Sequence, residues 1–262
     1  MENDLYLPLG FCGAVLIAFL GYRFQSLTKS GAVAAVIVGT IIFGFGGYVG
    51  AATLLFFFIS GSILSRLPRK LATEKVARDW KQVLCNGGAA ALAVLLVHFV
   101  PSYRQSATLF FFGSLGAATA DTWATEFGTR STMRTYHILS FRPIERGLSG
   151  GVSVAGIIAS VVGAFCCSLI PFFLLPGDDF LCGLFLAPVV PIVTAAGVIG
   201  SILDSIIGAS LQAKYRTLEG KIVEAPQAGA HLLSGVSWIT NDVTNLFMTF
   251  WAGLIAVGLT TF

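Results

Sequence analysis

Residues 31–64 read GAVAAVIVGTIIFGFGGYVGAATLLFFFISGSIL and contain no charged side chain. A membrane-spanning helix needs about 20 mostly apolar residues, with a lower limit near 17. The stretch is interrupted at Gly44-Phe45-Gly46-Gly47, and such a glycine cluster is typical of a tight turn. It therefore predicts two short spans, 31–46 and 48–64. The alternative is a re-entrant pair, which protein must cover because lipid does not tolerate non-helical backbone.

The composition of the whole chain agrees with a membrane protein. Of its 262 residues, 55% are hydrophobic and 11% are charged, and the mean hydropathy is +0.83. Soluble domains carry about 25% charged residues. The 30 glycines favour helices that pack closely, and the apolar runs do not alternate as barrel strands would. The composition predicts an all-α, polytopic helical membrane bundle.

Hydropathy divides the chain into about eight spans within a single membrane domain, residues 1–262. The N-terminal sequence Met1-Glu2-Asn3-Asp4 is acidic, whereas a cleaved signal peptide begins with basic residues. We therefore expect the first apolar run to be a retained span. The expected spans are 5–22, 31–46, 48–64, 83–100, 107–125, 150–174, 183–209 and 239–260.

The charges support this segmentation. If the spans alternate in direction, all of the 16 Lys and Arg residues except Arg104 fall on one side of the membrane. That side has loops near 65–82, 127–148 and 211–238, and the other side has the acidic residues Glu2, Asp4, Asp178 and Asp179. Because short basic loops stay in the cytoplasm, the basic side is predicted to be cytoplasmic, with both termini facing away from it.

Polar residues gather at the predicted span ends on this basic face. Carboxylates near bilayer depth, such as Asp121 and Asp204, are costly, so some interaction must offset their cost. The residues at these span ends are Ser62, Asn86, Asp121, Glu126, Ser149, Gly150, Gly151, Asp204, Asn241, Asp242 and Asn245.

Three interpretations of these residues compete. The first is helix capping and interhelical hydrogen bonding, in which Asn241 or Asp242 caps the last span. It fits Asp121 and Glu126 less well, because anions at a helix C-terminus oppose the helix dipole. The second interpretation is an ion-transport path. The third is a metal-phosphate site, since Mg²⁺ takes one or two carboxylates plus phosphate oxygens and water.

The basic loops favour the metal-phosphate site. Glycines at a helix start expose backbone N–H groups to phosphate, as Gly150 and Gly151 would. Phosphates could also be engaged by Arg66, Lys81, Arg142 and Arg146, although each is also a topology determinant. The topological role is the main interpretation of Arg69, Lys70, Lys75 and Arg78.

A short internal similarity leaves open a parallel repeat of two four-span halves. Ser30-Gly31-Ala32-Val33 opens the second span much as Ser149-Gly150-Gly151-Val152 opens the sixth. Transporters also use such repeats, so the similarity does not separate the interpretations.

Several of these motifs resemble one membrane protein family. The segment GAATADTWATEFG (116–128) resembles its ADTWA[ST]E[LVF]G signature, and QVLCNGG (82–88) is similar to its QVLANGG element. LSGGVS (148–153), GSILDSIIGA (200–209) and NDVTNL (241–246) resemble three further elements in the same order. The chain is thereby identified as resembling the DUF92 or transmembrane protein 19 family, which includes the phytyl-phosphate kinases of plants and cyanobacteria.

The resemblance implies a CTP-dependent kinase of tocopherol biosynthesis that converts an isoprenyl monophosphate, phytyl or geranylgeranyl phosphate, to the diphosphate at the cytoplasmic face. The acceptor is already ionised, and phosphoryl transfer relies mainly on positioning and charge neutralisation. The expected partners are membrane lipid, the isoprenyl phosphate and CTP, with no nucleic acid. The expected location is an inner (plasma) or thylakoid membrane if the source is bacterial. A transporter or lipid scramblase using the same carboxylates is the alternative.

On this hypothesis the site residues have three roles. Mg²⁺ would be held by Asp121, Glu126, Asp204 and Asp242. The amides of Asn86, Asn241 and Asn245 would orient phosphates or water on the metal. Substrate binding would use Ser62, Lys81, Arg146, Ser149, Gly150 and Gly151.

Overall fold

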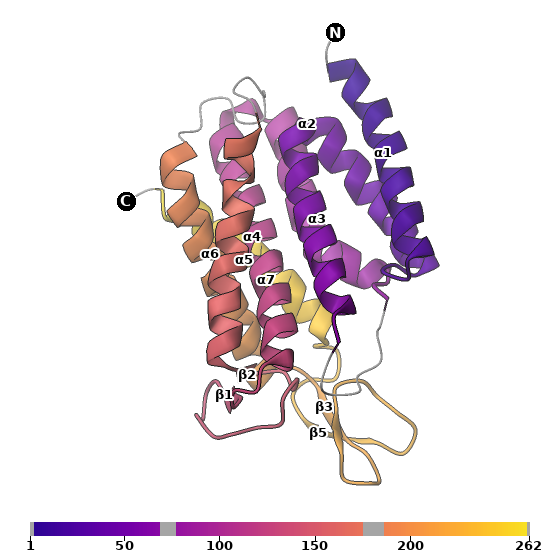
Figure 1. Cartoon of the computed structure of the whole chain (residues 1–262), viewed down its shortest axis with the longest axis vertical. Coiled ribbons are helices and arrows are strands. Elements are labelled where there is room, and N and C mark those ends of the chain that lie inside the picture. Colours follow the sequence, from indigo (N-terminus) through magenta and orange to yellow (C-terminus); the bar gives the residue numbers. More distant parts are fainter. Residues whose placement is uncertain (1–2, 69–76, 175–185, 261–262) are drawn as a thin grey trace.

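The computed structural model describes residues 3–68, 77–174 and 186–260. Within these ranges the chain forms seven α-helices, one 3₁₀ turn and five short strands (Figure 1). Glu2, Arg69, Lys70, Lys75, Asp178 and Asp179 lie outside them. The elements are α1 (Asn3–Arg23), α2 (Lys29–Arg66), α3 (Trp80–Phe99), η1 (Pro101–Tyr103), α4 (Arg104–Arg130), β1 (Tyr136–His137), β2 (Gly151–Val152), α5 (Val154–Phe173), α6 (Leu186–Ser210), β3 (Lys214–Arg216), β4 (Ile222–Val223), β5 (His231–Ser234) and α7 (Asn241–Gly258).

Side-chain caps fix where three of the helices begin. The Thr28 hydroxyl accepts a hydrogen bond from the N–H of Gly31 at the start of α2. Asp79 caps α3 through the N–H of Gln82, and Ser153 caps α5 through the N–H of Gly156. Such caps satisfy N–H groups that have no partner inside the helix.

Helix α2 folds back on itself at Gly47. The backbone of Gly47 has φ 57° and ψ −155°, a combination open essentially only to glycine. A straight helix of 38 residues would be about 57 Å long. Arg66, at its end, nevertheless donates a hydrogen bond to the Ser26 hydroxyl, just before its start, at 2.8 Å. The prediction of two short apolar segments that meet in a glycine turn is confirmed.

By length and composition, five helices of the described part can cross a membrane: α1, α2, α3, α5 and α6. Helix α4 is less apolar because it lies at the centre, against α2, α3, α5, α6 and α7. Its residues Ala117, Ala118 and Thr119 are fully buried, and small residues allow such close helix contact. The chain is thus a mostly helical membrane protein. The predicted count of eight spans is not established. By length and composition the folded helix α2 is a single candidate span, and α4 and α7 are not candidates.

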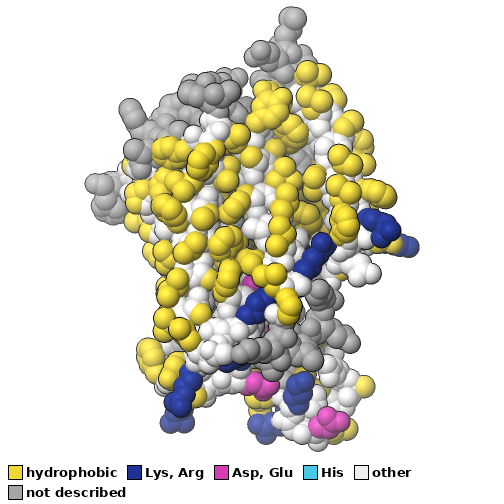
Figure 2. Space-filling view, viewed as in Figure 1, with side chains coloured by type: hydrophobic (Ala, Val, Ile, Leu, Met, Phe, Trp, Pro, Cys, Tyr) yellow, Lys and Arg dark blue, Asp and Glu magenta, His cyan; other side chains and the backbone are white. Residues whose placement is uncertain are grey.

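The outer surface of the bundle is apolar. Hydrophobic side chains cover most of the helical region in Figure 2, whereas the visible charged side chains lie in its lower half, toward the strands. Exposed examples are Phe19 on α1, Leu92 on α3 and Ile158 on α5. The interior is filled by Phe111, Phe112 and other fully buried side chains. A large apolar exterior is what a surface in contact with lipid requires.

The second and third predicted loops lie at one end of the bundle, and the chain there forms strands that an all-α prediction omits (Figure 1). Strand β1 pairs antiparallel with β2, and β3 pairs with both β4 and β5. In the second sheet Tyr215 faces Val223, and Lys214 faces Ser234. Gly220 and Gly229, with φ of 83° and 77°, allow the chain to reverse between these strands.

The two stretches that suggested a repeat have different backbones. Ser30 and Gly31 lie in the first turn of α2, whereas Gly150 precedes α5 with φ 85° and Gly151 begins β2. This similarity therefore does not support two equivalent halves.

Candidate functional site

A polar cleft of about 730 Å³ lies at the loop end of the bundle. The ends of α2, α3, α4, α6 and α7 and the start of α5 form its walls together with the loop before α5. Of the predicted site residues, the cleft is lined by Ser62, Asn86, Asp121, Glu126, Arg146, Ser149, Gly150, Gly151, Asp204, Asn241 and Asn245, but not by Lys81 or Asp242.

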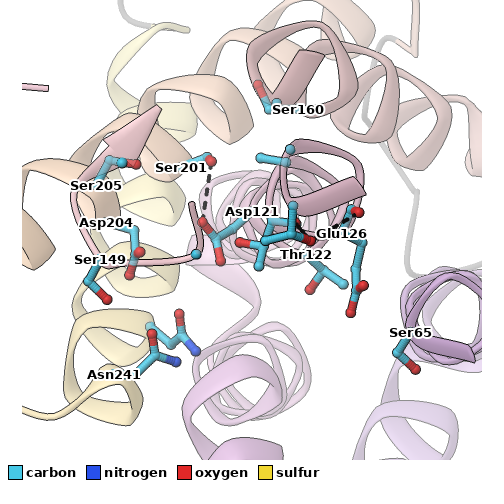
Figure 3. A pocket seen from close by; sticks show the side chains of 18 of the residues that line it. Ser65, Asp121, Thr122, Glu126, Ser149, Ser160, Ser201, Asp204, Ser205 and Asn241 are labelled. Atoms are coloured by element: carbon cyan, nitrogen blue, oxygen red, sulfur yellow. Dashed lines mark hydrogen bonds between the residues drawn. The ribbon is translucent and has the colours of Figure 1, made fainter. Parts of the chain in front are cut away.

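Two aspartates from different helices face the middle of the cleft. Figure 3 shows Asp121 of α4 and Asp204 of α6 directed toward a common space, with Asn241 of α7 on its far side. Ser201, one turn before Asp204, has its hydroxyl 3.3 Å from Oδ1 of Asp121. In the described part of the chain, Oδ1 of Asp204 and Oδ1 of Asn245 are buried without a hydrogen-bond partner. Unpaired buried oxygens are costly in free energy, and a bound cation or hydrogen-bond donor would offset that cost.

The glycine-rich loop of residues 147–151 forms one wall of the cleft. Gly147 and Gly150 have φ of 89° and 85°, values that favour glycine. A Cβ atom on Gly150 would lie 2.6 Å from the Cα of Ala209 on α6. The loop therefore approaches α6 as closely as the backbone allows.

Glu224 holds this loop from the strand side. Its carboxylate accepts hydrogen bonds from the Ser149 N–H at 2.6 Å, the Ser149 hydroxyl at 2.9 Å and Gln212 Nε2 at 3.2 Å. Lys214 Nζ donates to the carbonyl of Ser149 at 3.0 Å. Burial lowers the pKa of Lys214, and the charge of Glu224 partly counteracts this. Both hydrogen-bond donors of Ser149, a predicted substrate-binding residue, are therefore engaged by Glu224.

Glu126 also has a partner within the protein. Its Oε2 lies 2.5 Å from Nη1 of Arg130, and Arg130 also donates to the carbonyls of Leu64 and Leu67. The pair thus joins the end of α4 to the end of α2. The described residues contain no group of three or more His, Cys, Asp or Glu side chains placed to hold a metal. The structure brings Asp121 and Asp204 together, rather than the four predicted carboxylates.

Helix geometry explains why two predicted residues lie outside the cleft. Asn241 and Asn245, four residues apart, share a face of α7, and Gln82 and Asn86 share a face of α3. Asp242 and Lys81 are each one residue away from these faces, a rotation of about 100°. Lys81 lies over the ring of Trp80 instead, 5.8 Å from its centroid.

Arg78 is a cleft residue that sequence reasoning assigned to topology. Its N–H and carbonyl pair with Ser26 and Thr28, which places it beside the start of α2. Its guanidinium carbon lies 5.1 Å from the centroid of the Phe57 ring. Burial lowers the pKa of Arg78 to about 10, and the charge of Glu126 partly opposes this, so Arg78 is still charged at neutral pH.

Other cleft residues were also missed. Ser201 and Ser205 lie at helical spacing around Asp204 in the GSILDS segment, which was a usable signal. Glu224 had no signal, because it reaches Ser149 only through the fold of the third loop.

These features define a polytopic helical membrane protein with a polar, carboxylate-lined cleft at one end. The chain belongs to the integral membrane protein family DUF92, whose profile matches residues 12–253.

Several relatives support this membership. The chain is 31% identical to Protein PGR of Arabidopsis thaliana, over 88% of each chain. It is 32% identical to an uncharacterized membrane protein of Methanocaldococcus jannaschii, over 82% of this chain and 87% of that one. It is 24% identical to the chloroplastic protein VTE6 of Arabidopsis thaliana, over 88% of this chain and 64% of that one. No solved structure matches the chain significantly.

Proposed function

We propose that this protein is a CTP-dependent kinase that phosphorylates an isoprenyl monophosphate, phytyl or geranylgeranyl phosphate, to the diphosphate. The observation that carries the proposal is the pair of aspartates, Asp121 and Asp204, facing one cleft with the buried Oδ1 of Asp204 unpaired. The resemblance of their motifs to the phytyl-phosphate kinases of the family supports the same reaction.

The donors and acceptors in the cleft suit a complex of Mg²⁺ and phosphate. Asp121 and Asp204 would hold the ion, which fits a metal that takes one or two carboxylates. When bound, Mg²⁺ would neutralise charge on the phosphate oxygens. Asn86, Asn241 and Asn245 would orient the phosphates, and Arg146 and the N–H of Gly150 would bind them, since the N–H groups of Ser149 and Gly151 donate to Glu224 and to the Leu148 carbonyl. Ser62, whose buried hydroxyl is unpaired in the described structure, is a further donor to the ligand.

The reaction needs little covalent chemistry from the protein. An oxygen of the lipid phosphate attacks the γ-phosphorus of CTP, the new P–O bond forms, and the bond to the CDP oxygen breaks. Because the attacking oxygen is already ionised, no strong general base is required. The protein contributes alignment and electrostatic stabilisation.

The proposal includes the orientation in the membrane. Arg23, Arg66, Arg78 and Arg130 lie at the end of the bundle that carries the cleft. If basic loops stay in the cytoplasm, the cleft opens to cytoplasmic CTP. In this topology each half of α2 and each other helix crosses the bilayer, giving eight crossings.

A transfer assay tests the proposal. Purified protein in nanodiscs is incubated with CTP labelled at the γ-phosphate, Mg²⁺ and geranylgeranyl or phytyl phosphate. We expect labelled lipid diphosphate and stoichiometric CDP. Absence of transfer from every nucleoside triphosphate, together with lipid or ion flux in proteoliposomes, would favour the transporter or scramblase instead.

A further inference from the structure

A second cavity, of about 150 Å³, lies between α1, both halves of α2 and the start of α3. Its wall is almost wholly apolar, with small residues such as Gly13, Ala14 and Gly39 at the points where helices meet. Along α2 it extends from Ala51 to Phe58, a helix rise of about 10 Å. The cavity is therefore an elongated apolar space within the bundle.

The apolar cavity adjoins the polar cleft. Among the described residues that line it, only Arg78, Gln82 and Asn86 have polar side chains, and all three also line the cleft. One end of the apolar space thus meets the polar cleft beside a cation. A nucleotide cannot occupy such a space without losing its hydrogen bonds to water.

The environment of Arg78 leaves its charge available to a ligand. In the described part of the chain its guanidinium makes no ion pair, and the guanidinium carbon lies 5.1 Å from the centroid of the Phe57 ring and 5.7 Å from that of the Phe58 ring. Gly61 provides the room for this group, since a Cβ atom there would lie 2.5 Å from Nη2 of Arg78. A buried cation is stabilised when an anion pairs with it, and guanidinium binds phosphate through two parallel hydrogen bonds.

We propose that the apolar cavity holds the part of the isoprenyl tail that adjoins the phosphate of the isoprenyl monophosphate. Arg78 binds that phosphate at the junction with the cleft. This assignment rests on the proposed function, whose acceptor it places. It accounts for both parts of an amphiphilic substrate: the tail lies among α1, α2 and α3, and the head lies in the cleft. Arg78 is then a substrate-binding residue rather than only a topology determinant.

A binding assay without nucleotide tests the head-group half of the proposal. Purified full-length protein is titrated with radiolabelled geranylgeranyl phosphate, and geranylgeraniol is the matched ligand without phosphate. Arg78→Gln removes charge-assisted hydrogen bonds and should weaken the binding of geranylgeranyl phosphate by about tenfold or more. The affinity for geranylgeraniol should stay unchanged. Arg23→Gln, which removes an exposed charge at the same end, should bind both as wild type does.

A matched pair of alanines tests the tail half. Ala51 lines the cavity at its far end, and its neighbour Ala52 does not. Ala51→Phe should weaken binding of twenty-carbon geranylgeranyl phosphate by about tenfold through overpacking, with a smaller effect on five-carbon dimethylallyl phosphate, whose chain is too short to reach Ala51. Ala52→Phe should affect the two lipids equally. A merely structural defect would likewise weaken both lipids to the same extent, so a selective effect on the longer lipid reports on the cavity.

The outcomes separate this proposal from the kinase assignment. Wild-type affinity in Arg78→Gln, or an Ala51→Phe effect no larger for the longer lipid, would overturn it even if the protein transfers phosphate from CTP. The expected binding pattern in a protein that transfers no phosphate would support it and remove the kinase assignment. If Arg78→Gln does not elute as a monodisperse protein, Arg78→Lys replaces it, with an expected loss of severalfold because lysine cannot bind phosphate bidentately.

Discussion

The hydroxyl of Ser201 lies 3.3 Å from Oδ1 of Asp121 and joins α6 to α4 in the cleft. Because Asp204 follows Ser201 by three residues, the same contact brings a second carboxylate toward Asp121. Asp204 is close enough to repel the charge of Asp121. Two carboxylates held this way are unfavourable by themselves and favourable around a cation.

Neutralising either aspartate separates activity from stability. Asp121→Asn and Asp204→Asn should lower lipid diphosphate formation by about 100-fold or more, as loss of key electrostatic groups does. Their melting temperatures in detergent should not fall, because each change removes buried repulsion. Asp242→Asn, outside the cleft, is the control and should keep its activity. Normal turnover in Asp204→Asn would contradict the proposed role.

Magnesium should stabilise the wild-type protein through the same pair. A ligand that binds only the folded state raises the melting temperature in proportion to its binding free energy. We expect Mg²⁺ with CDP to raise the melting temperature of the wild type and not that of Asp204→Asn. Equal shifts in both proteins would place the ion elsewhere. The measurement needs no turnover.

Removing the Glu224 carboxylate should loosen the glycine-rich loop. In Glu224→Ala the two Ser149 donors and Gln212 lose their acceptor, which should cost about 1–3 kcal/mol. Glu224→Gln keeps one acceptor oxygen and should cost less. Thermal unfolding compares the two variants, and turnover should fall along with stability. Faster turnover in Glu224→Ala would instead show that Glu224 competes with substrate for Ser149.

Gly150 should be far less tolerant of substitution than Gly220, although both have positive φ, 85° and 83°. Gly220→Ala meets no atom within 4 Å, so it should cost only the backbone strain, about 1–2 kcal/mol. Gly150→Ala adds a collision with Ala209 on α6. Its melting temperature should therefore fall well below that of Gly220→Ala. Equal losses would show that the loop can move away from α6.

The predicted orientation can be read from cysteine labelling. In a background without the native cysteines, Glu219→Cys in the third loop and Ser102→Cys in η1 place exposed thiols at opposite ends of the bundle. A membrane-impermeant maleimide applied to intact cells should label Ser102→Cys. It should label Glu219→Cys only after the cells are opened. The reverse pattern would place the cleft outside the cytoplasm.

Much of the architecture is readable from local sequence. The uncharged run of residues 31–64 predicts two helices, and its glycines predict the reversal at Gly47, because chain reversal depends on local backbone freedom. Asn241 and Asn245 share a helix face by their spacing alone. The span count does not follow from hydropathy alone, since hydropathy describes contact with lipid, and α4 contacts mainly other helices.

The sequence by itself determined that this is a helical membrane protein, where its chain turns, and which polar residues collect at one end. These properties follow from the length of the apolar runs, the conformations open to glycine and the placement of charge, all of which can be read along a continuous stretch of chain. Only the tertiary structure decided that Glu224 holds Ser149, that Arg78 lies between the cleft and an apolar cavity, and that Lys81 and Asp242 lie outside the cleft. Those relationships join residues distant in the chain or depend on how far each helix is rotated about its axis, and both are set by the packing of the whole bundle.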